Sequence, residues 1–155
     1  MPLSDAQKLA QKKYNDTHKD RRRYLSYRNT AKTFLRNYAT DSDLDELASL
    51  VADRRQINKQ LSALALIEEL ISDPSFESKT HAAVTVWQKP ADLLSHHLTL
   101  PNADPVHVTT WFTQTVATKF DENLPLVEIV FNNQTLVYDA FSARDIVEWL
   151  SKTAN

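Results

Sequence analysis

The chain has 155 residues and a formal net charge of −2, and it contains no glycine and no cysteine. The lack of glycine excludes dinucleotide fingerprints, Walker A loops and nucleophile elbows, because each needs glycine for a strained turn or a close approach to phosphate. The lack of cysteine excludes disulfides, thiolate nucleophiles and cysteine-ligated metal sites. The length predicts one ordinary hydrophobic core, or a small core with a helical extension.

The charge divides into two opposed parts along the chain. Residues 1–39 hold 10 Lys or Arg against 3 Asp, a net of +7, whereas residues 40–155 hold 8 basic against 17 acidic residues, a net of −9. A basic segment attracts nucleic acid or another anionic surface. We therefore expect a binding protein rather than an enzyme, with no cofactor.

The basic part of the chain, residues 1–39, begins with a predicted helix. Ser4 or Asp5 caps this helix, which extends to about Tyr14. Weak helix breakers at residues 15–17 interrupt it before the arginine-rich run. From Thr30, apolar residues recur with the spacing of a helix that buries one face. These residues are Ala31, Phe34, Leu35 and Tyr38.

The next helix is predicted from a cap at Thr40, whose hydroxyl is placed to bond the amide of Asp43. The pattern allows a helix of about 30 residues or one that breaks near Asn58. Pro74 ends it, because its ring disfavours a helical residue before it. We place a boundary at residues 73–80.

The fold class expected is α+β, with a helical N-terminal region followed by a smaller region with a β-hairpin and a C-terminal helix. The basic arm and helical region occupy residues 1–73, and the α+β region occupies residues 80–155. Within the latter, we expect a strand at 82–87, helical turns at 91–97, and a helix capped by Asp104 with Pro105 in its first turn.

The β-hairpin is expected at residues 126–141, with strands Leu126–Phe131 and Thr135–Phe141. Asn132 and Asn133 supply the turn, because asparagine tolerates a positive φ angle. A capping box at Ser142 opens the terminal helix, residues 142–152.

Histidines give no metal site by spacing. His96, His97 and His107 form the only local grouping, and adjacent helical residues point about 100° apart, which does not favour sharing of one ion. We therefore expect no metal.

The strongest candidate for function is the basic and aromatic segment near the N-terminus. One interpretation is a solvated helix face on which Tyr24, Leu25 and Tyr27 pack on the core while the arginines stay in water. The other is contact with nucleic acid or a nucleoprotein, where guanidinium groups grip phosphates and rings stack on bases. The candidate binding residues are Lys12, Lys13, Arg21, Arg22, Arg23, Tyr24, Tyr27, Arg28, Lys32 and Arg36.

Two further functions fit the order of the elements. A ribbon-helix-helix regulator that binds DNA would use residues 22–28 as the ribbon, residues 30–38 as the first helix and Ser42 onward as the second. An oligomerising scaffold would pair the helix from Thr40 to Ile71 with its copy in a homodimer.

Residues 8–55 also resemble the N-terminal module of small phage- and plasmid-borne proteins of Gram-positive lactic-acid bacteria. The resemblance lies in Lys12–Asn15, Arg21–Tyr24, Tyr27-Arg28, Ala31-Lys32, Phe34–Thr40 and Asp43–Leu47. Some proteins of that kind are anti-CRISPR inhibitors of the type II effector nuclease. The resemblance therefore implies an inhibitor whose partner is the CRISPR effector nuclease with its guide RNA. The division of charge suits such an inhibitor, because an acidic surface could occupy a basic channel of the effector by mimicry of DNA while the basic arm holds phosphates of guide RNA or DNA.

Targeting signals are not evident in the sequence. The N-terminus lacks an apolar core behind a basic start, and the richest apolar run, residues 61–71, contains Ser62 and the Glu68-Glu69 pair. We expect no signal peptide, no membrane span and a cytoplasmic location.

Overall fold

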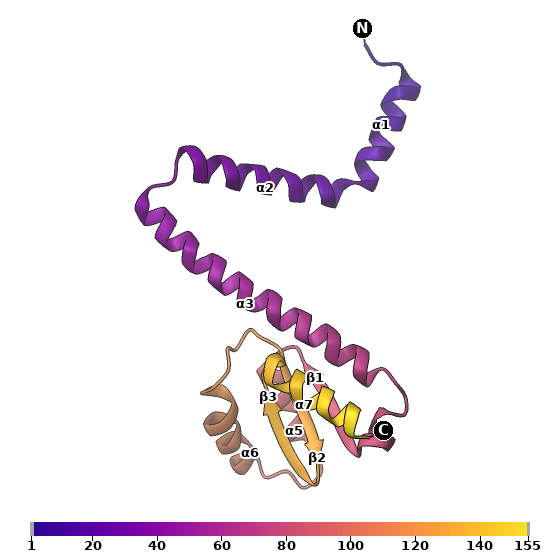
Figure 1. Ribbon diagram of the computed structural model, residues 1–155, viewed down its shortest axis with the longest axis vertical. Coiled ribbons are helices and arrows are strands. Elements are labelled where there is room, and N and C mark those ends of the chain that lie inside the picture. Colours follow the sequence, from indigo (N-terminus) through magenta and orange to yellow (C-terminus); the bar gives the residue numbers. More distant parts are fainter. Residues whose placement is uncertain (1, 155) are drawn as a thin grey trace. The chain divides into compact units, whose positions relative to one another are not determined.

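A computed structural model describes residues 2–154 of the chain. The α+β class is confirmed, with a helical N-terminal region, a three-stranded antiparallel sheet and a C-terminal helix (Figure 1). The chain forms two compact units, Met1–Val51 and Ala52–Asn155. The division falls inside a long helix rather than at residues 73–80, because the second half of that helix packs with the sheet.

The first helix, α1, spans Asp5–Thr17 and begins with the predicted cap. The Ser4 hydroxyl accepts a hydrogen bond from the amide of Gln7, and the Gln7 side chain accepts one from the amide of Ser4. This reciprocal pair satisfies two amides that a helix start leaves free. α1 continues through residues 15–17, past its predicted end at Tyr14, and His18 separates it from α2, which spans Lys19–Asn37.

The third helix, α3, spans Asp41–Ile71 without a break at Asn58. Its cap is the predicted one, since the amide of Asp43 donates to the Thr40 hydroxyl over 3.2 Å. The Asp43 carboxylate in turn accepts from the amide and the hydroxyl of Thr40, each over 2.8 Å. These two bonds lower the pKa of Asp43, because they favour its charged form.

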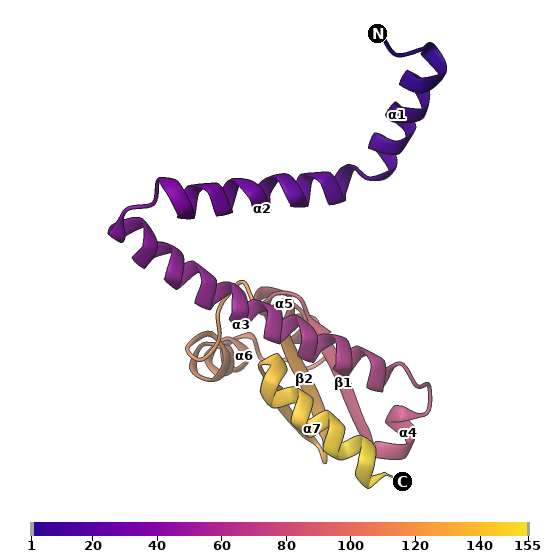
Figure 2. The same ribbon diagram turned by 45° about the horizontal axis from the view of Figure 1, so that its top comes forward.

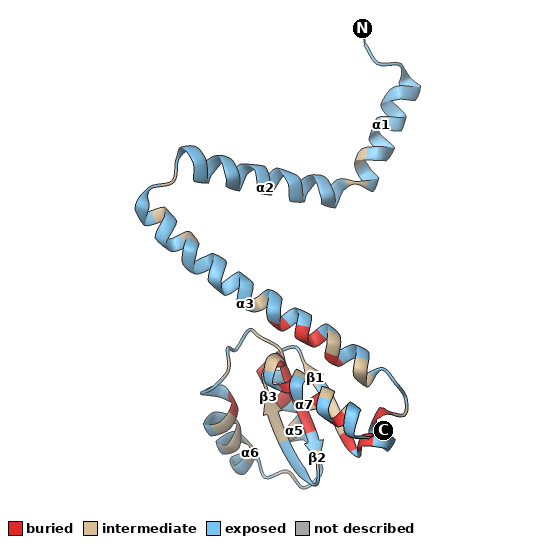
Figure 3. Ribbon diagram, viewed as in Figure 1, coloured by how far each residue is buried: buried red, intermediate tan, exposed pale blue. Residues whose placement is uncertain are grey.

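The prediction that the helix after Thr30 buries one face is wrong. Among residues 2–51 none is buried, and Figure 3 shows α1 and α2 exposed along their length. Phe34 and Tyr38 are 38% and 71% exposed. The packing of Tyr24, Leu25 and Tyr27 on the core is also absent, because all three are exposed.

The ribbon of the expected ribbon-helix-helix fold is absent as well. Residues 22–28 are helical and belong to α2, where backbone groups bond within the helix. A helix leaves no extended edge for the strand pairing that such a dimer needs. The arrangement of elements therefore differs from that regulator fold.

The sheet has the strand order β1-β2-β3, with β1 at Ala82–Trp87, β2 at Leu126–Phe131 and β3 at Gln134–Tyr138. The predicted hairpin is confirmed as β2 and β3, but the predicted end of its second strand at Phe141 is wrong. β3 ends at Tyr138, because Asp139 caps the terminal helix and Phe141 lies in that helix. Asn132 and Asn133 make its turn with φ angles of 50° and 61°. In a chain without glycine, asparagine takes these left-handed positions at a small steric cost.

One face of the sheet packs against α3 and α7 (Ala140–Thr153), and the short helix α4 (Phe76–Thr80) contacts its edge (Figure 2). This core consists of side chains that alternate along β1 and β2, together with the apolar stripe of the second half of α3. Its fully buried members are Ile67, Ala82, Val127, Ile129, Ala140, Ala143 and Val147.

The opposite face packs against α5 (Pro90–Thr99) and a π-helical segment, η1 (Phe112–Ala117), which continues α6 (Pro105–Trp111). Leu93, Val116 and Leu126 form its buried centre. The cap of α6 is as predicted, since the Asp104 carboxylate accepts from the amide of Val106 over 3.1 Å.

The terminal helix begins two residues before the predicted Ser142. Asp139 is its N-cap, and its carboxylate accepts a bond from the Ser142 amide over 2.9 Å. The amide of Ala140 also donates to the buried side-chain oxygen of Gln60 in α3. Aspartate is as good a cap as serine, and this contact with α3 fixes the earlier start.

Candidate functional site

All ten candidate binding residues lie on exposed helix surface. Lys12 and Lys13 are in α1, and the other eight are in α2, which holds seven basic residues and one acidic residue. The structure therefore brings most of the candidates onto one helix. Those on α2 are Arg21, Arg22, Arg23, Tyr24, Tyr27, Arg28, Lys32 and Arg36.

Helix geometry divides these eight residues between two faces of α2. With about 100° between successive residues, five cations fall within an arc of about 120°. We call them the cationic face. Its members are Arg21, Arg22, Arg28, Lys32 and Arg36.

The expected mixture of rings and cations occurs only at the edge of that face. Tyr27 and Arg23 project from the other side of α2, about 100° from the nearest edge of the cationic arc, whereas Tyr24 lies about 40° beyond Arg28. Tyr24 therefore borders the cationic face, and Tyr27 lies outside it. The helical period, applied to the sequence of α2, already predicts which of these residues share a face.

The cations of α2 have no acidic partners. Ion pairs within residues 2–154 involve Lys8, Lys79, His97 and Arg144, and none involves a residue of α2. Within the cationic face, Arg28, Lys32 and Arg36 follow one another at four-residue intervals. Like charges at that spacing destabilise an isolated helix by about 0.2–0.5 kcal/mol per pair.

The N-terminus of α2 adds a second electrostatic cost. Arg21, Arg22 and Arg23 lie near the end where the helix dipole is positive, and only Asp20 in the first turn opposes them. The N-cap residue His18 forms no side-chain cap. An anion beside this segment would relieve both costs, because it neutralises the cations and accepts bonds from them.

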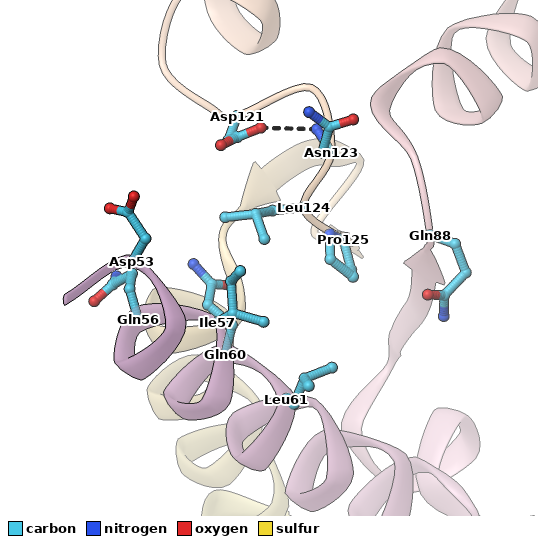
Figure 4. A pocket seen from close by; sticks show the side chains of 10 residues that line it. All are labelled: Asp53, Gln56, Ile57, Gln60, Leu61, Gln88, Asp121, Asn123, Leu124 and Pro125. Atoms are coloured by element: carbon cyan, nitrogen blue, oxygen red, sulfur yellow. Dashed lines mark hydrogen bonds between the residues drawn. The ribbon is translucent and has the colours of Figure 1, made fainter. Parts of the chain in front are cut away.

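A cavity of about 630 Å³ lies in the second unit, between α3 and the loop before β2 (Figure 4). Its polar groups are mainly side-chain amides, and its charges are the carboxylates of Asp53 and Asp121. The Asp121 carboxylate accepts a hydrogen bond from the amide of Asn123 over 2.9 Å. The charge of this cavity is opposite to that required for binding phosphate.

Sequence reasoning missed one chemical pair, which joins His97 of α5 to Glu128 of β2. The His97 ring nitrogen Nε2 and the buried Glu128 carboxylate are hydrogen-bonded. His97 also lines a cavity of about 210 Å³ with His107 and Trp111. The signal in the sequence is Glu128 itself, the one charged residue in an otherwise apolar strand.

The three grouped histidines do not converge on one ion. His96 lies against Trp87 with ring centroids 4.9 Å apart, while His97 lies against Trp111. Across residues 2–154, no group of three or more His, Cys, Asp or Glu side chains is arranged to hold a metal. Over the same range, no helix combines the length and apolar character needed to cross a membrane.

No family model, no curated protein and no solved structure matches this chain.

Proposed function

We propose that this chain is a non-catalytic binding protein that inhibits a type II CRISPR effector nuclease by stoichiometric binding. In this proposal the cationic face of α2 contacts phosphates of the guide RNA or target DNA held by the effector. The chain acts in the cytoplasm, where such a complex meets invading DNA. Blockade by occupancy needs no catalytic residue.

The observation that supports this proposal best is the unpaired cationic face. Arg21 and Arg36 are 15 positions apart, so the face extends about 22 Å along the helix. That length allows several phosphates to be contacted along one groove of a nucleic acid. Arginine, which supplies four of the five cations, binds phosphate through two parallel hydrogen bonds.

The choice of effector rests on the resemblance of residues 8–55 to phage- and plasmid-borne proteins. It is also supported by the acidic remainder of the chain, since residues 40–155 have a net charge of −9. Type II effectors hold guide and target in positively charged channels. A chain with a basic helix and an acidic remainder thus offers complementary charge to both the protein and the nucleic-acid surfaces of such a complex.

The test compares two charge-reversed variants. Arg21→Glu/Arg28→Glu/Lys32→Glu changes the cationic face, and Arg54→Glu/Arg55→Glu/Lys59→Glu makes the same change of net charge on exposed residues of α3. Binding to a guide-loaded type II effector is measured at several salt concentrations.

We expect the first variant to lose at least about 100-fold in affinity and to flatten the slope of log affinity against log salt by about 2 to 3. The α3 variant retains the wild-type slope. Equal affinities for the wild type and the cationic-face variant would show that the proposed surface is incorrect. Circular dichroism of both variants confirms that the helices remain formed.

A further inference from the structure

The side of α2 opposite the cationic face carries an apolar stripe with a regular period. Five residues follow one another at intervals of three, four, three and four positions, which is the spacing of a coiled-coil seam. Tyr24 and Tyr27 in this stripe are 64% and 69% exposed. We call it the aromatic stripe. Its members are Tyr24, Tyr27, Ala31, Phe34 and Tyr38.

A second stripe of the same period lies at the beginning of α3. Leu44, Leu47 and Val51 are spaced by three and four positions, and none of them is buried. Four acidic residues and no basic residue accompany them within residues 41–51. We call this segment the acidic stripe.

We propose that the aromatic stripe of one copy of the chain packs on the acidic stripe of a second copy, forming a symmetric dimer. By two-fold symmetry, this contact occurs twice. The inference does not depend on the proposed function, because it uses a different face of α2.

Charge selects this pairing over the alternatives. Pairing α2 with α2 of another copy would bring two sets of seven basic residues together, and pairing the two acidic stripes would oppose four acids with four acids. Pairing α2 with the start of α3 instead opposes Arg23 and Arg28, which border the aromatic stripe on its two sides, to Asp41 and Asp43, which border the acidic stripe. Charges that flank a coiled-coil seam determine partner choice in this way.

The area available also fits a dimer. A buried aromatic side chain removes about 150–250 Å² of surface from water, and the two copies together contribute eight aromatic rings. With partial burial of these rings and of the leucines and valines opposite them, the contact removes on the order of 1,000–1,500 Å². Stable protein interfaces bury about 1,200–2,000 Å² in total.

A hollow on α2 offers a place for partner side chains. It measures about 500 Å³ and includes Phe34 and Tyr38 of the aromatic stripe among its lining residues. The cationic face lies mostly outside it. A dimer of this kind therefore leaves most of the cationic face of each copy open to solvent.

The first test is sedimentation of the full chain at several concentrations. We expect a monomer–dimer equilibrium, and we expect Tyr27→Ser/Phe34→Ser to raise the dimer dissociation constant at least about tenfold, as for residues at the centre of an interface. The control is Leu25→Ser, which removes an exposed apolar side chain from within the arc of the cationic face. A wild-type chain that stays monomeric at 100 micromolar or above, or equal loss in both variants, would overturn the proposal.

The second test identifies the contacting helices and uses the absence of native cysteine. Tyr27→Cys carrying an affinity tag is mixed with untagged Leu47→Cys and oxidised. The proposal predicts a disulfide-linked species containing one chain of each kind. Linked species found only between like variants would contradict the pairing of α2 with α3.

Binding of a guide-loaded effector by Tyr27→Ser/Phe34→Ser is measured separately. If this variant retains effector binding, the result supports separate faces for the effector and the second copy. If it loses effector binding, the aromatic stripe contacts the effector instead of a second copy.

Discussion

Replacing Ile67 by alanine tests where the folding free energy of this chain is located. Ile67 lies in the second half of α3, is 0% exposed and belongs to the core between α3, the sheet and α7. Leu50 lies on the same helix and is 53% exposed. Each change to alanine removes the same number of carbon atoms, so the two variants differ mainly in what surrounds the side chain.

The expected magnitudes differ by several-fold. Ile67→Ala loses the transfer free energy of the buried carbons and leaves a cavity, which together cost about 2–5 kcal/mol. Leu50→Ala should change the free energy of unfolding by no more than about 0.5 kcal/mol, as for other exposed sites. For a unit of roughly 100 residues, the first value corresponds to a fall in Tm of about 9–23 °C.

The assay is urea unfolding followed by tryptophan fluorescence. Trp87, Trp111 and Trp149 all lie in the second unit, so the signal reports that unit. Equal losses of stability in the two variants would refute the reasoning, as would a loss below about 1 kcal/mol for Ile67→Ala. Either result would mean that the burial of α3 described above does not govern stability.

Three other predictions concern local contacts. Hydrogen bonds from Thr40 lower the pKa of Asp43 below its ordinary value of 3.8. Their contribution to helix capping is therefore present above pH 3.8 and is lost as the pH falls through the pKa that Asp43 has in the folded state. In Thr40→Ala, carboxyl NMR titration should give a higher pKa for Asp43. His97→Ala removes the partner of the buried Glu128 carboxylate and should lower the free energy of unfolding in urea by about 1–3 kcal/mol. Adding Glu128→Leu to that variant should recover part of the loss. If the stability changes of the two single variants simply added in the double variant, the pairing would be contradicted. Asn133 has a φ angle of 61°, so Asn133→Ala should lower stability by about 1–2 kcal/mol and Asn133→Gly should not, as thermal unfolding of the two variants will show.

Local patterns predicted several elements closely. The hairpin strands, the asparagine turn, the Asp104 cap with Pro105 after it, and the cap at Thr40 all depend on residues a few positions apart. Such signals are strong because the backbone bonds concerned are local. The sequence predicts that α7 begins at Ser142, which is two residues too late. The hydrogen bond between Ala140 and Gln60 that favours the earlier start joins distant parts of the chain, so no local pattern reveals it.

Burial in the N-terminal region could not be predicted from periodicity. The apolar spacing of Ala31, Phe34 and Tyr38 identifies a face that favours a contact, but it does not say which surface supplies that contact. Ala31, Phe34 and Tyr38 are all exposed in the structure. The π-helical segment η1 was also missed, because no local residue pattern distinguishes it from an α-helix.

The exposure of the candidate site could be predicted from the sequence. The density of charge identifies the basic segment, and the structure places it on exposed helix, as both the solvated-face and the binding interpretations require. The place of Tyr24 at the edge of the cationic face, and of Tyr27 outside it, follows from helical geometry once α2 is known to be continuous. The His97–Glu128 pair joins residues 31 positions apart, so only the fold brings it together.

The most direct test of the account is a titration of DNA cleavage by a guide-loaded type II effector with increasing amounts of this chain. We predict that cleavage falls linearly to zero at a fixed molar ratio, and that the Arg21→Glu/Arg28→Glu/Lys32→Glu variant fails to inhibit while the α3 control variant inhibits normally. Undiminished cleavage at a large molar excess of the wild-type chain would contradict the proposed function.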